Sequence, residues 1–405
     1  MGDCKLCKTN KPITKICLNV TDDCCLACRY CFVQQKPNYM TYETAKFATD
    51  WIISNGKDNY ISFFGGEPLL CWDSIVKPLT LYIREELQLN SEEFGLSITT
   101  NGILLDEDKL KFMKQYEIYP LLSMDGAKDT QDFNRPCKNN ASSFDILDKK
   151  LDLILQYFPD ITFRGTIIPE TCNYFSDNLE YAANKGVKNT FFIIDASADW
   201  AEESRKILET EVRKYSNYLV NCFINDEPII RQRTFEQGLI KVVKNNILAC
   251  QGGKRKNFSL EQSPCGSGQG FASIAWNGDI YSCQEVPTRD EEKSIFYLGN
   301  IFTGIEEGRQ LNLLSQLKNK QDIFNHTDKE KCKSCLIEGS CNTSSCMINN
   351  YLYTGSLYTQ TDAACWWDNL MAKEAIYVCN FLGSLKNYAF EDYFKFVLTS
   401  EGGCL

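Results

Sequence analysis

The high number of cysteines is the sequence feature that most constrains the fold and chemistry of this chain. Twenty-one of its 405 residues are cysteines, whereas it contains a single histidine, His326. One histidine excludes zinc catalysis through several histidine ligands, and it excludes Ser-His-Asp and Cys-His mechanisms unless His326 takes part. Secreted disulfide scaffolds are usually short and carry a signal peptide, but no apolar signal segment follows Met1. Thiolate ligands for zinc or for iron–sulfur clusters are therefore the better explanation.

Length, composition and charge narrow the class of protein. A chain with 43% hydrophobic residues and this length can bury a large core. No run of 18 apolar residues occurs, so we expect no membrane span and no membrane partner. The net charge of −10 argues against a nucleic-acid partner. We expect a cytoplasmic protein, because so many reduced thiols suit a reducing compartment.

Short apolar runs alternate with amphipathic helical patterns from residue 14 to about 198. The predicted strands are 14–19, 60–64, 95–99, 119–123, 161–168 and 189–194, and the predicted helices lie near 41–54, 72–88, 106–116, 142–157 and 174–185. Strands that alternate with helices form parallel sheets with right-handed crossovers. Six units are fewer than the eight of a closed barrel, so the predicted fold class is α/β, an open partial (β/α)6 barrel with its chemistry at the carboxyl ends of the strands.

The rest of the chain changes character twice. The pattern is helical and more polar to about residue 249, and then Gly, Ser, Asn and Cys dominate while regular periodicity fades. Such a segment needs another source of stability, which metal clusters would supply. The predicted domains are an N-terminal extension 1–13, the barrel 14–198, a helical bridge 199–249, a small cysteine-rich domain 250–366 and a C-terminal helical segment 367–405.

A first cysteine motif follows the first predicted strand. Cys24, Cys28 and Cys31 have the spacing CxxxCxxC and are followed by the aromatic Phe32. Three thiolates can hold three irons of a 4Fe–4S cube and leave the fourth iron open. This motif resembles the signature of the radical S-adenosylmethionine superfamily; the alternative is a zinc knuckle or a set of buried thiols. The resemblance implies that the methionyl group of S-adenosylmethionine binds the open iron and that an electron from the cluster releases a 5′-deoxyadenosyl radical.

Other segments resemble the cofactor-binding motifs of that family. Gly65, Gly66 and Glu67 match its GGEP motif, which implies a contact with the methionyl amino group. Arg164 resembles the arginine that pairs with the methionyl carboxylate; its alternative is a structural arginine. One departure is Gln131, which precedes Asp132 where the family often has a histidine. The complete set of cofactor contacts that the resemblance implies is Phe32, Gly65, Gly66, Glu67, Asn101, Ser123, Asp125, Arg135 and Arg164.

A second group of cysteines resembles the SPASM domain of peptide-modifying radical enzymes. The resemblance implies two auxiliary 4Fe–4S clusters, and therefore three clusters in all. Carried over by position, the first auxiliary cluster takes Cys265, Cys283 and Cys346, with Cys250 or an open iron as the fourth ligand. The second takes Cys332, Cys335, Cys341 and Cys365. The spacing from Cys341 to Cys346 is one residue longer than in the family, and two zinc sites are the alternative.

The SPASM resemblance implies a polypeptide substrate. Sulfatase-maturing relatives use an Asp directly after the equivalent of Cys283, but this chain has Gln284 there, which cannot accept a proton. We therefore expect a maturase of ribosomally made peptides that forms a side-chain crosslink, with a Cys thioether as the first choice. The expected partners are a cysteine-containing precursor peptide and an external electron donor of flavodoxin or ferredoxin type. The alternatives are carbon–carbon crosslinking, formylglycine formation, small-molecule radical chemistry and a non-catalytic iron–sulfur module.

Overall fold

A computed structural model describes residues 12–250, 266–289, 293–318, 335–337, 346–357 and 359–399. The chain divides into two compact units that are discontinuous in sequence. Unit 1 contains Met1–Ala27, Cys31–Leu121 and Leu260–Lys318, and unit 2 contains Cys28–Tyr30, Leu122–Ser259 and Asn319–Leu405. This division by contacts differs from the predicted domains, which follow sequence motifs and stay predictions. No helix in the described ranges is long and apolar enough to cross a bilayer.

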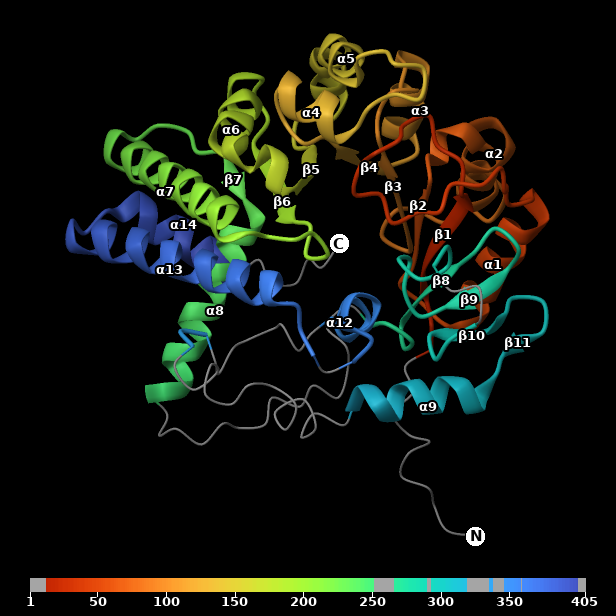
Figure 1. Cartoon of the computed structure of the whole chain (residues 1–405). Coiled ribbons are helices and arrows are strands. Elements are labelled where there is room, and N and C mark those ends of the chain that lie inside the picture. Colours follow the sequence, from red (N-terminus) through yellow and green to blue (C-terminus); the bar gives the residue numbers. More distant parts are fainter. Residues whose placement is uncertain are drawn as a thin grey trace. The chain divides into compact units, whose positions relative to one another are not determined.

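Unit 1 is organised by a mixed sheet. Strand β1 (Lys15–Thr21) pairs in parallel with β2 (Asn59–Gly65), which pairs in parallel with β3 (Phe94–Thr100). On its other side β1 pairs in parallel with β8 (Phe271–Ile274). The antiparallel strands β9 (Asp279–Tyr281), β10 (Tyr297–Asn300) and β11 (Gly304–Ile305) extend the sheet from β8 (Figure 1). All of β1 except Lys15 is buried, as expected for a central parallel strand.

Helices α1 and α3 of unit 1 begin at polar caps. Helix α1 (Tyr42–Asn55) starts after Thr41, whose hydroxyl accepts a hydrogen bond from the Thr44 amide. Helix α3 (Glu107–Gln115) starts after Asp106, which caps the Lys109 amide, and α9 (Glu307–Lys318) follows β11. The observed ends of β2 and α3 agree with the predicted strand 60–64 and the predicted helix 106–116 to within two residues.

The predicted helix 72–88 is the least regular segment of unit 1. It follows the 3₁₀ turn η2 (Pro68–Cys71) and consists of the π-helix η3 (Trp72–Val76), the short α2 (Lys77–Leu81) and the π-helix η4 (Tyr82–Glu86). Pro78 lies at the start of α2 and has no backbone N–H to donate to the preceding turn. The segment is therefore helical as predicted, but only Lys77–Leu81 of it is α-helical.

Unit 2 contains a parallel sheet covered by helices. The chain passes from unit 1 into unit 2 within β4 (Ile118–Ser123), and β5 (Thr162–Ile167), β6 (Asn189–Ile194) and β7 (Arg231–Gln232) pair in parallel. Between them lie α4 (Lys128–Asn134), α5 (Ser143–Tyr157), the 3₁₀ helix η5 (Pro169–Tyr174), α6 (Phe175–Asn184) and α7 (Glu202–Asn225). The strand–helix alternation confirms the predicted α/β class.

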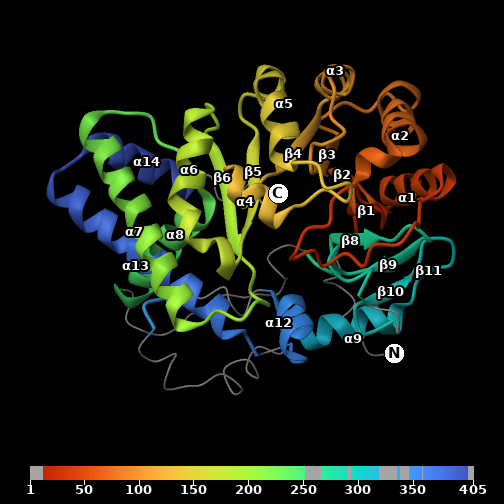
Figure 2. The same cartoon turned by 45° about the horizontal axis from the view of Figure 1, so that its top comes forward.

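The C-terminal helices of unit 2 pack against its middle helices. Helices α8 (Arg233–Cys250), α12 (Met347–Thr354), α13 (Asp362–Ser384) and α14 (Tyr388–Thr399) complete the unit. Figures 1 and 2 show α13 beside both α7 and α8. Arg213 on α7 donates to both carboxylate oxygens of Glu374 on α13, each at 2.7 Å. Such a paired geometry fixes the orientation of the two helices as well as adding energy.

Three features were missing from the sequence prediction. Helix α4 is only seven residues long, and β7 has two residues. The cysteine-rich segment after residue 250 was expected to lack regular structure, but it contributes β8 to β11. These strands have two to four residues each, so they are too short to show a two-residue hydrophobic period.

The crossing of α8 and α13 generates a first prediction. A Cβ placed on Gly238 of α8 would lie 2.8 Å from backbone atoms of Met371 on α13. Gly238→Ala should therefore force the helices apart and lower the free energy of unfolding by about 1–3 kcal/mol. Chemical denaturation followed by circular dichroism measures the change.

The matched control is Gly383→Ala on α13, where no atom lies within 4 Å of the added Cβ. That change should raise the free energy of unfolding by about 0.5–1 kcal/mol, because alanine loses less backbone entropy in a helix. Equal effects of the two substitutions would contradict a close backbone contact at Gly238.

Candidate functional site

The glycine turn after β2 is hydrogen-bonded to the backbone that leads into the first cysteine motif. The Gly66 amide donates to the Thr21 carbonyl at 2.7 Å, and the Glu67 amide donates to the Asp23 carbonyl at 2.8 Å. A Cβ on Gly65 would lie 2.2 Å from the Thr21 carbonyl oxygen, and one on Gly66 would lie 2.0 Å from that of Asp23. Only glycine permits this approach, so the turn fixes the position of the chain directly before Cys24.

Glu67 is a completely buried carboxylate in this turn. Its oxygens accept hydrogen bonds from the Leu69 amide at 3.0 Å, the Thr100 hydroxyl at 2.7 Å and the Asn101 amide at 2.8 Å. Burial raises the pKa of Glu67 to about 7, although the three donors oppose the shift. The side chain thereby joins the carboxyl end of β2 to that of β3. The pKa of this carboxyl group lies close to neutral pH.

The side-chain amide of Asn101 lies against two adjacent sulfur atoms. Its Nδ2 atom is 3.5 Å from Cys24 Sγ and 3.4 Å from Cys25 Sγ. The Leu26 amide also donates to Cys24 Sγ at 3.4 Å. A hydrogen bond between the two thiols raises the pKa of Cys24, together with burial, and lowers the pKa of Cys25. Asn101, predicted as a cofactor contact, thus has partners within the cysteine motif itself.

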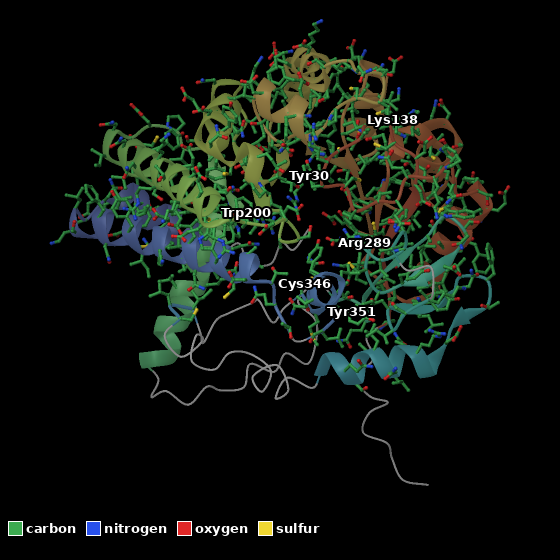
Figure 3. All side chains as sticks on the ribbon, in the orientation of Figure 1. Tyr30, Lys138, Trp200, Arg289, Cys346 and Tyr351 are labelled. Carbon is green, nitrogen blue, oxygen red and sulfur yellow. The ribbon has the colours of Figure 1, made fainter. Side chains whose placement is uncertain are left out.

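Phe32, the aromatic residue after the motif, is held by two elements of unit 1. Its ring stacks on Phe64 of β2 with centroids 6.3 Å apart. The Arg289 guanidinium, labelled in Figure 3, lies 5.1 Å from the same ring, and Arg289 Nε donates to the Phe32 carbonyl. Sequence reasoning missed Arg289, because nothing in its local pattern indicates a partner more than 250 residues away.

Asp125 is the centre of a buried network in unit 2. Its carboxylate accepts hydrogen bonds from Tyr30 OH at 2.6 Å, Asn134 Nδ2 at 2.9 Å, Arg135 Nε at 3.0 Å and the Thr166 amide at 3.0 Å. Its own amide donates to Gln131 Oε1 at 2.9 Å. The predicted residues Asp125 and Arg135 are therefore brought together. Ser123, the other predicted contact of this segment, is the last residue of β4.

The two predicted arginines have different surroundings. Burial alone would lower the pKa of Arg135, but the charge of Asp125 raises it above its usual range. Arg164 on β5 donates to the carbonyls of Gly165 at 2.7 Å and Phe191 at 3.3 Å, and its guanidinium stacks over the Phe191 ring at 4.7 Å. Arg164 is thus oriented by backbone and ring contacts on β5 and β6.

Four of the predicted auxiliary ligands have described side chains. Cys335 donates to Asn369 Oδ1 at 3.2 Å, and Asn369 Nδ2 donates to the Cys365 carbonyl at 2.9 Å. Cys283 donates to Gln284 Oε1 at 3.7 Å, and Cys346, labelled in Figure 3, is the residue directly before α12. Cys250 ends α8. Cys265, Cys332 and Cys341 lie outside the described residues, so the roles predicted for these eight cysteines stay predictions.

No three Cys, His, Asp or Glu side chains within the described ranges converge as ligands of a single metal ion. Cys24 is buried, Cys28 is half-buried and Cys31 is exposed. Each thiolate of an iron–sulfur cube binds a different iron, so its ligands need not meet at one point. The roles of Cys24, Cys28 and Cys31 therefore stay predictions that this geometry permits.

Glu67 generates a prediction on pH dependence. Its folded-state pKa of about 7 exceeds the ordinary value of 4.5, so the folded protein binds this proton more tightly than the unfolded chain. The stability linked to that proton is complete at acid pH and is lost as the pH rises through about 7. When the pH rises from about 5 to about 8, the unfolding free energy of the metal-free protein should fall by up to about 3 kcal/mol through Glu67. This part of the fall should be absent in Glu67→Gln.

Chemical denaturation at the two pH values measures this difference. Glu43→Gln, a change on the exposed side of α1, is the control and should keep the pH dependence of the unchanged protein. The same slope in Glu67→Gln as in the unchanged protein would contradict a raised pKa at this site.

The comparisons with known proteins agree with this arrangement. Residues 18–182 match the Radical SAM superfamily model. Over 306 residues the chain is 23% identical to the radical SAM cyclopropyl synthase TigE of Paramaledivibacter caminithermalis, covering 68% of this chain and 58% of that protein. It is 23% identical over 221 residues to the cysteine-type anaerobic sulfatase-maturating enzyme of Clostridium perfringens, covering 52% of this chain and 60% of the enzyme. The matches thus span about three fifths of the length of these relatives.

Solved structures share the fold. The sulfatase-maturating enzyme anSMEcpe with bound AdoMet superimposes with a TM-score of 0.68 at 19% identity, covering 96% of this chain and 98% of the other. Streptococcus suis SuiB bound to its precursor peptide SuiA gives a TM-score of 0.57 at 15% identity, covering 88% of this chain and 76% of SuiB. These similarities confirm the predicted partial-barrel fold. Residues 18–182 therefore form a radical SAM domain.

Proposed function

We propose that the chain is a radical SAM peptide maturase that crosslinks a ribosomally made precursor peptide. Cys24, Cys28 and Cys31 would hold the 4Fe–4S cluster that binds S-adenosylmethionine. The observation that carries the proposal is the packing of the glycine turn and Asn101 around Cys24, within a domain of this superfamily. When bound, the reduced cluster and S-adenosylmethionine supply a 5′-deoxyadenosyl radical that removes hydrogen from substrate.

The surroundings of Cys24 fit a thiolate ligand. Two N–H groups, from Leu26 and from Asn101, point at its sulfur. Hydrogen bonds to a cluster sulfur favour its charged form and help to set the reduction potential. A metal deprotonates the thiol that it binds, so the shared proton of Cys24 and Cys25 would leave when iron enters.

The residues around the glycine turn fit the methionyl end of S-adenosylmethionine. Glu67, with a pKa of about 7, would bind a positively charged amino group and be ionised by it. The absence of side chains at Gly65 and Gly66 lets this turn lie directly against the Thr21 and Asp23 carbonyls, next to the proposed cluster ligand Cys24. Arg164 offers a planar guanidinium for the methionyl carboxylate, as its resemblance to the family arginine implies.

An auxiliary cluster region is supported by Asn369. Its side chain contacts both Cys335 and Cys365, which lie 30 residues apart in sequence. A single side chain that spans two predicted ligands of one cluster indicates that these ligands are gathered in the folded chain. We therefore keep the SPASM domain over 250–366 and two auxiliary clusters as part of the proposal, with an external flavodoxin or ferredoxin as electron donor.

Gln284 supports crosslinking over formylglycine formation. Its backbone carbonyl accepts from Asn19 Nδ2 at 3.4 Å, and its side-chain oxygen accepts from Cys283. An amide at this position offers no general base for the oxidation of a substrate Cys or Ser. Two proteins of similar fold bind peptides, since SuiB binds the precursor peptide SuiA and anSMEcpe binds the Cp18Cys peptide. We propose a Cys thioether as the product and the cytoplasm as the compartment, because the clusters and thiols require reducing conditions.

The product test uses the anaerobically purified enzyme, reductant, S-adenosylmethionine and a cysteine-containing precursor peptide encoded near the gene. A crosslink removes two hydrogen atoms, so mass spectrometry should find the peptide lighter by about two mass units per crosslink. Cysteines in a thioether should resist alkylation, and 5′-deoxyadenosine should form in step with product.

Other outcomes identify the alternatives. Alkylatable thiols in a lighter peptide indicate a carbon–carbon crosslink, and an aldehyde on a sulfatase-type peptide indicates formylglycine formation. An unchanged peptide together with 5′-deoxyadenosine formation would remove the enzyme from peptide maturation. No 5′-deoxyadenosine under any condition would overturn the proposed chemistry altogether.

Iron content tests the ligand set independently of activity. Three cubes predict roughly twelve irons per chain, and Cys28→Ala should lose roughly four of them, because a cube needs its ligands. The control is Cys222→Ala, since Cys222 is buried in α7 and is not a predicted ligand. If Cys28→Ala contains as much iron as the unchanged protein, the proposed cluster site at Cys28 is excluded. Two or three zinc ions per chain in place of the iron would indicate zinc sites instead of clusters.

A further inference from the structure

We propose that the side-chain amide of Asn369 donates a hydrogen bond to the cysteine ligands of the second auxiliary cluster and thereby raises the reduction potential of that cluster. The inference rests on the proposed function, because it takes Cys335 and Cys365 as two of the ligands. Asn369 lies on α13, is partly buried, and was not among the predicted site residues.

One face of α13 meets the segment that contains Cys335. This face carries four residues at intervals of four, three and four positions, which are Cys365, Asn369, Ala372 and Ile376. Cys335 packs against a buried apolar cluster that Ala372 forms with Ile337 and with Val242 of α8. Ile337 is completely buried, so it fixes the position of Cys335 two residues earlier. The segment 335–337 therefore lies against the same face of α13 as Asn369.

An ion pair fixes this part of α13 beside α8, its neighbour in Figure 1. Lys241 Nζ on α8 lies 2.9 Å from an oxygen of Asp368, the residue directly before Asn369, and the Lys241 side chain is only 9% exposed. Separation of two such charges would leave a buried cation without a partner, which is costly. Asn369 thus belongs to a turn of α13 whose position is fixed.

The side-chain amide of Asn369 contacts both predicted ligands. Cys335 Sγ donates to Asn369 Oδ1 at 3.2 Å. Asn369 Nδ2 donates to the Cys365 carbonyl at 2.9 Å and lies 4.0 Å from Cys365 Sγ. One amide therefore has its acceptor and its donor next to two sulfur-bearing residues of one proposed cluster.

A cysteine that binds iron needs the donor side of this amide. A metal deprotonates the thiol that it binds, and a thiolate has no proton to give to Asn369 Oδ1. An Asn side chain also carries an NH₂ group, and rotation about its last bond exchanges the oxygen and the nitrogen, which are of similar size. Asn369 can therefore bond to Cys335 both as a thiol and as a thiolate, which neither a Leu side chain nor a carboxylate can do.

A donated hydrogen bond favours the reduced form of a cluster. Reduction adds one electron, so the negative charge on the ligating sulfurs grows, and an N–H donor stabilises the more negative state. Hydrogen bonds to the sulfurs are among the factors that set the reduction potential of an iron–sulfur cluster. Asn369 therefore makes electron uptake from the proposed external donor more favourable at the cluster of Cys335 and Cys365.

The test measures reduction potentials in the full chain that carries Cys28→Ala, so that the two auxiliary clusters alone contribute signals. Asn369→Leu in this background keeps a side chain of similar size but removes both hydrogen-bonding groups. The control is Asn380→Leu, the same exchange at an exposed position about three turns later in α13. Redox titration followed by electron paramagnetic resonance gives the potentials, and metal analysis gives the iron per chain.

In Asn369→Leu, the reduction equilibrium of one auxiliary cluster should fall about tenfold, a shift of about 59 mV to lower potential for one electron, because one hydrogen bond to a charged sulfur is lost. The other cluster should keep its potential. Asn369→Asp should lower the same potential further, since a carboxylate donates no hydrogen bond and adds negative charge. Both variants should keep the roughly eight irons of two cubes, and Asn380→Leu should keep both potentials.

Unchanged potentials in Asn369→Leu, with both clusters present, would overturn the inference and leave the proposed function intact. Loss of one cluster from both Asn369 variants would also overturn it, because Asn369 would then be needed to assemble the site and not to set its potential. An equal shift in Asn380→Leu would overturn it as unspecific. Absence of both clusters from the Cys28→Ala parent would instead refute the auxiliary clusters of the proposed function.

Discussion

The close backbone contact between the glycine turn and the end of β1 is the constraint on which the site depends. Two amides of the turn donate to the carbonyls of Thr21 and Asp23, at distances that leave no space for a side chain on Gly65 or Gly66. This contact fixes the exit of β1 relative to β2, and Cys24 follows immediately. The buried carboxylate of Glu67 then connects the same point to the end of β3. The glycine turn with Glu67 thus connects the ends of β1, β2 and β3, and it is also a candidate cofactor contact.

The cysteine motif is divided between the two units, since Cys24 and Cys31 belong to unit 1 and Cys28–Tyr30 belong to unit 2. Cys24 and Cys25 contact Asn101 in unit 1, whereas Arg29 and Tyr30 contact the 133–135 segment in unit 2. The two buried carboxylates next to these contacts, Glu67 and Asp125, differ in the charge of their hydrogen-bond partners. Glu67 is surrounded by neutral donors, and its pKa rises to about 7, whereas Asp125 has the permanent charge of Arg135 as its partner. Glu67 is therefore the group able to respond to a charged ligand.

The similar proteins differ in what they do. They include a radical SAM cyclopropyl synthase, sulfatase-maturating enzymes and a protein bound to its precursor peptide. A shared fold supports the radical chemistry, but the product depends on the few side chains that meet the peptide. In the proposed function Gln284 is such a position, because this residue is an amide where the sulfatase-maturing pattern needs a base. The proposal of a crosslink rather than formylglycine depends on that one difference in chemistry.

The sequence by itself determined the alternation of strands and longer helices from residue 14 to about 198, the superfamily motif and the glycine turn. These are local signals, because the hydrophobic period, the helix caps and the spacing of the ligands can be recognised within a short stretch of consecutive residues. Only the tertiary structure decided that β8, from the cysteine-rich segment, pairs with β1, that Arg289 stacks on Phe32, and that Asp125 and Arg135 hold Tyr30. These partners lie about 95 to 260 residues apart, and nothing local in a sequence specifies a distant partner for a buried charge or ring. Which polar side chain meets a cofactor and which meets the protein is decided by packing.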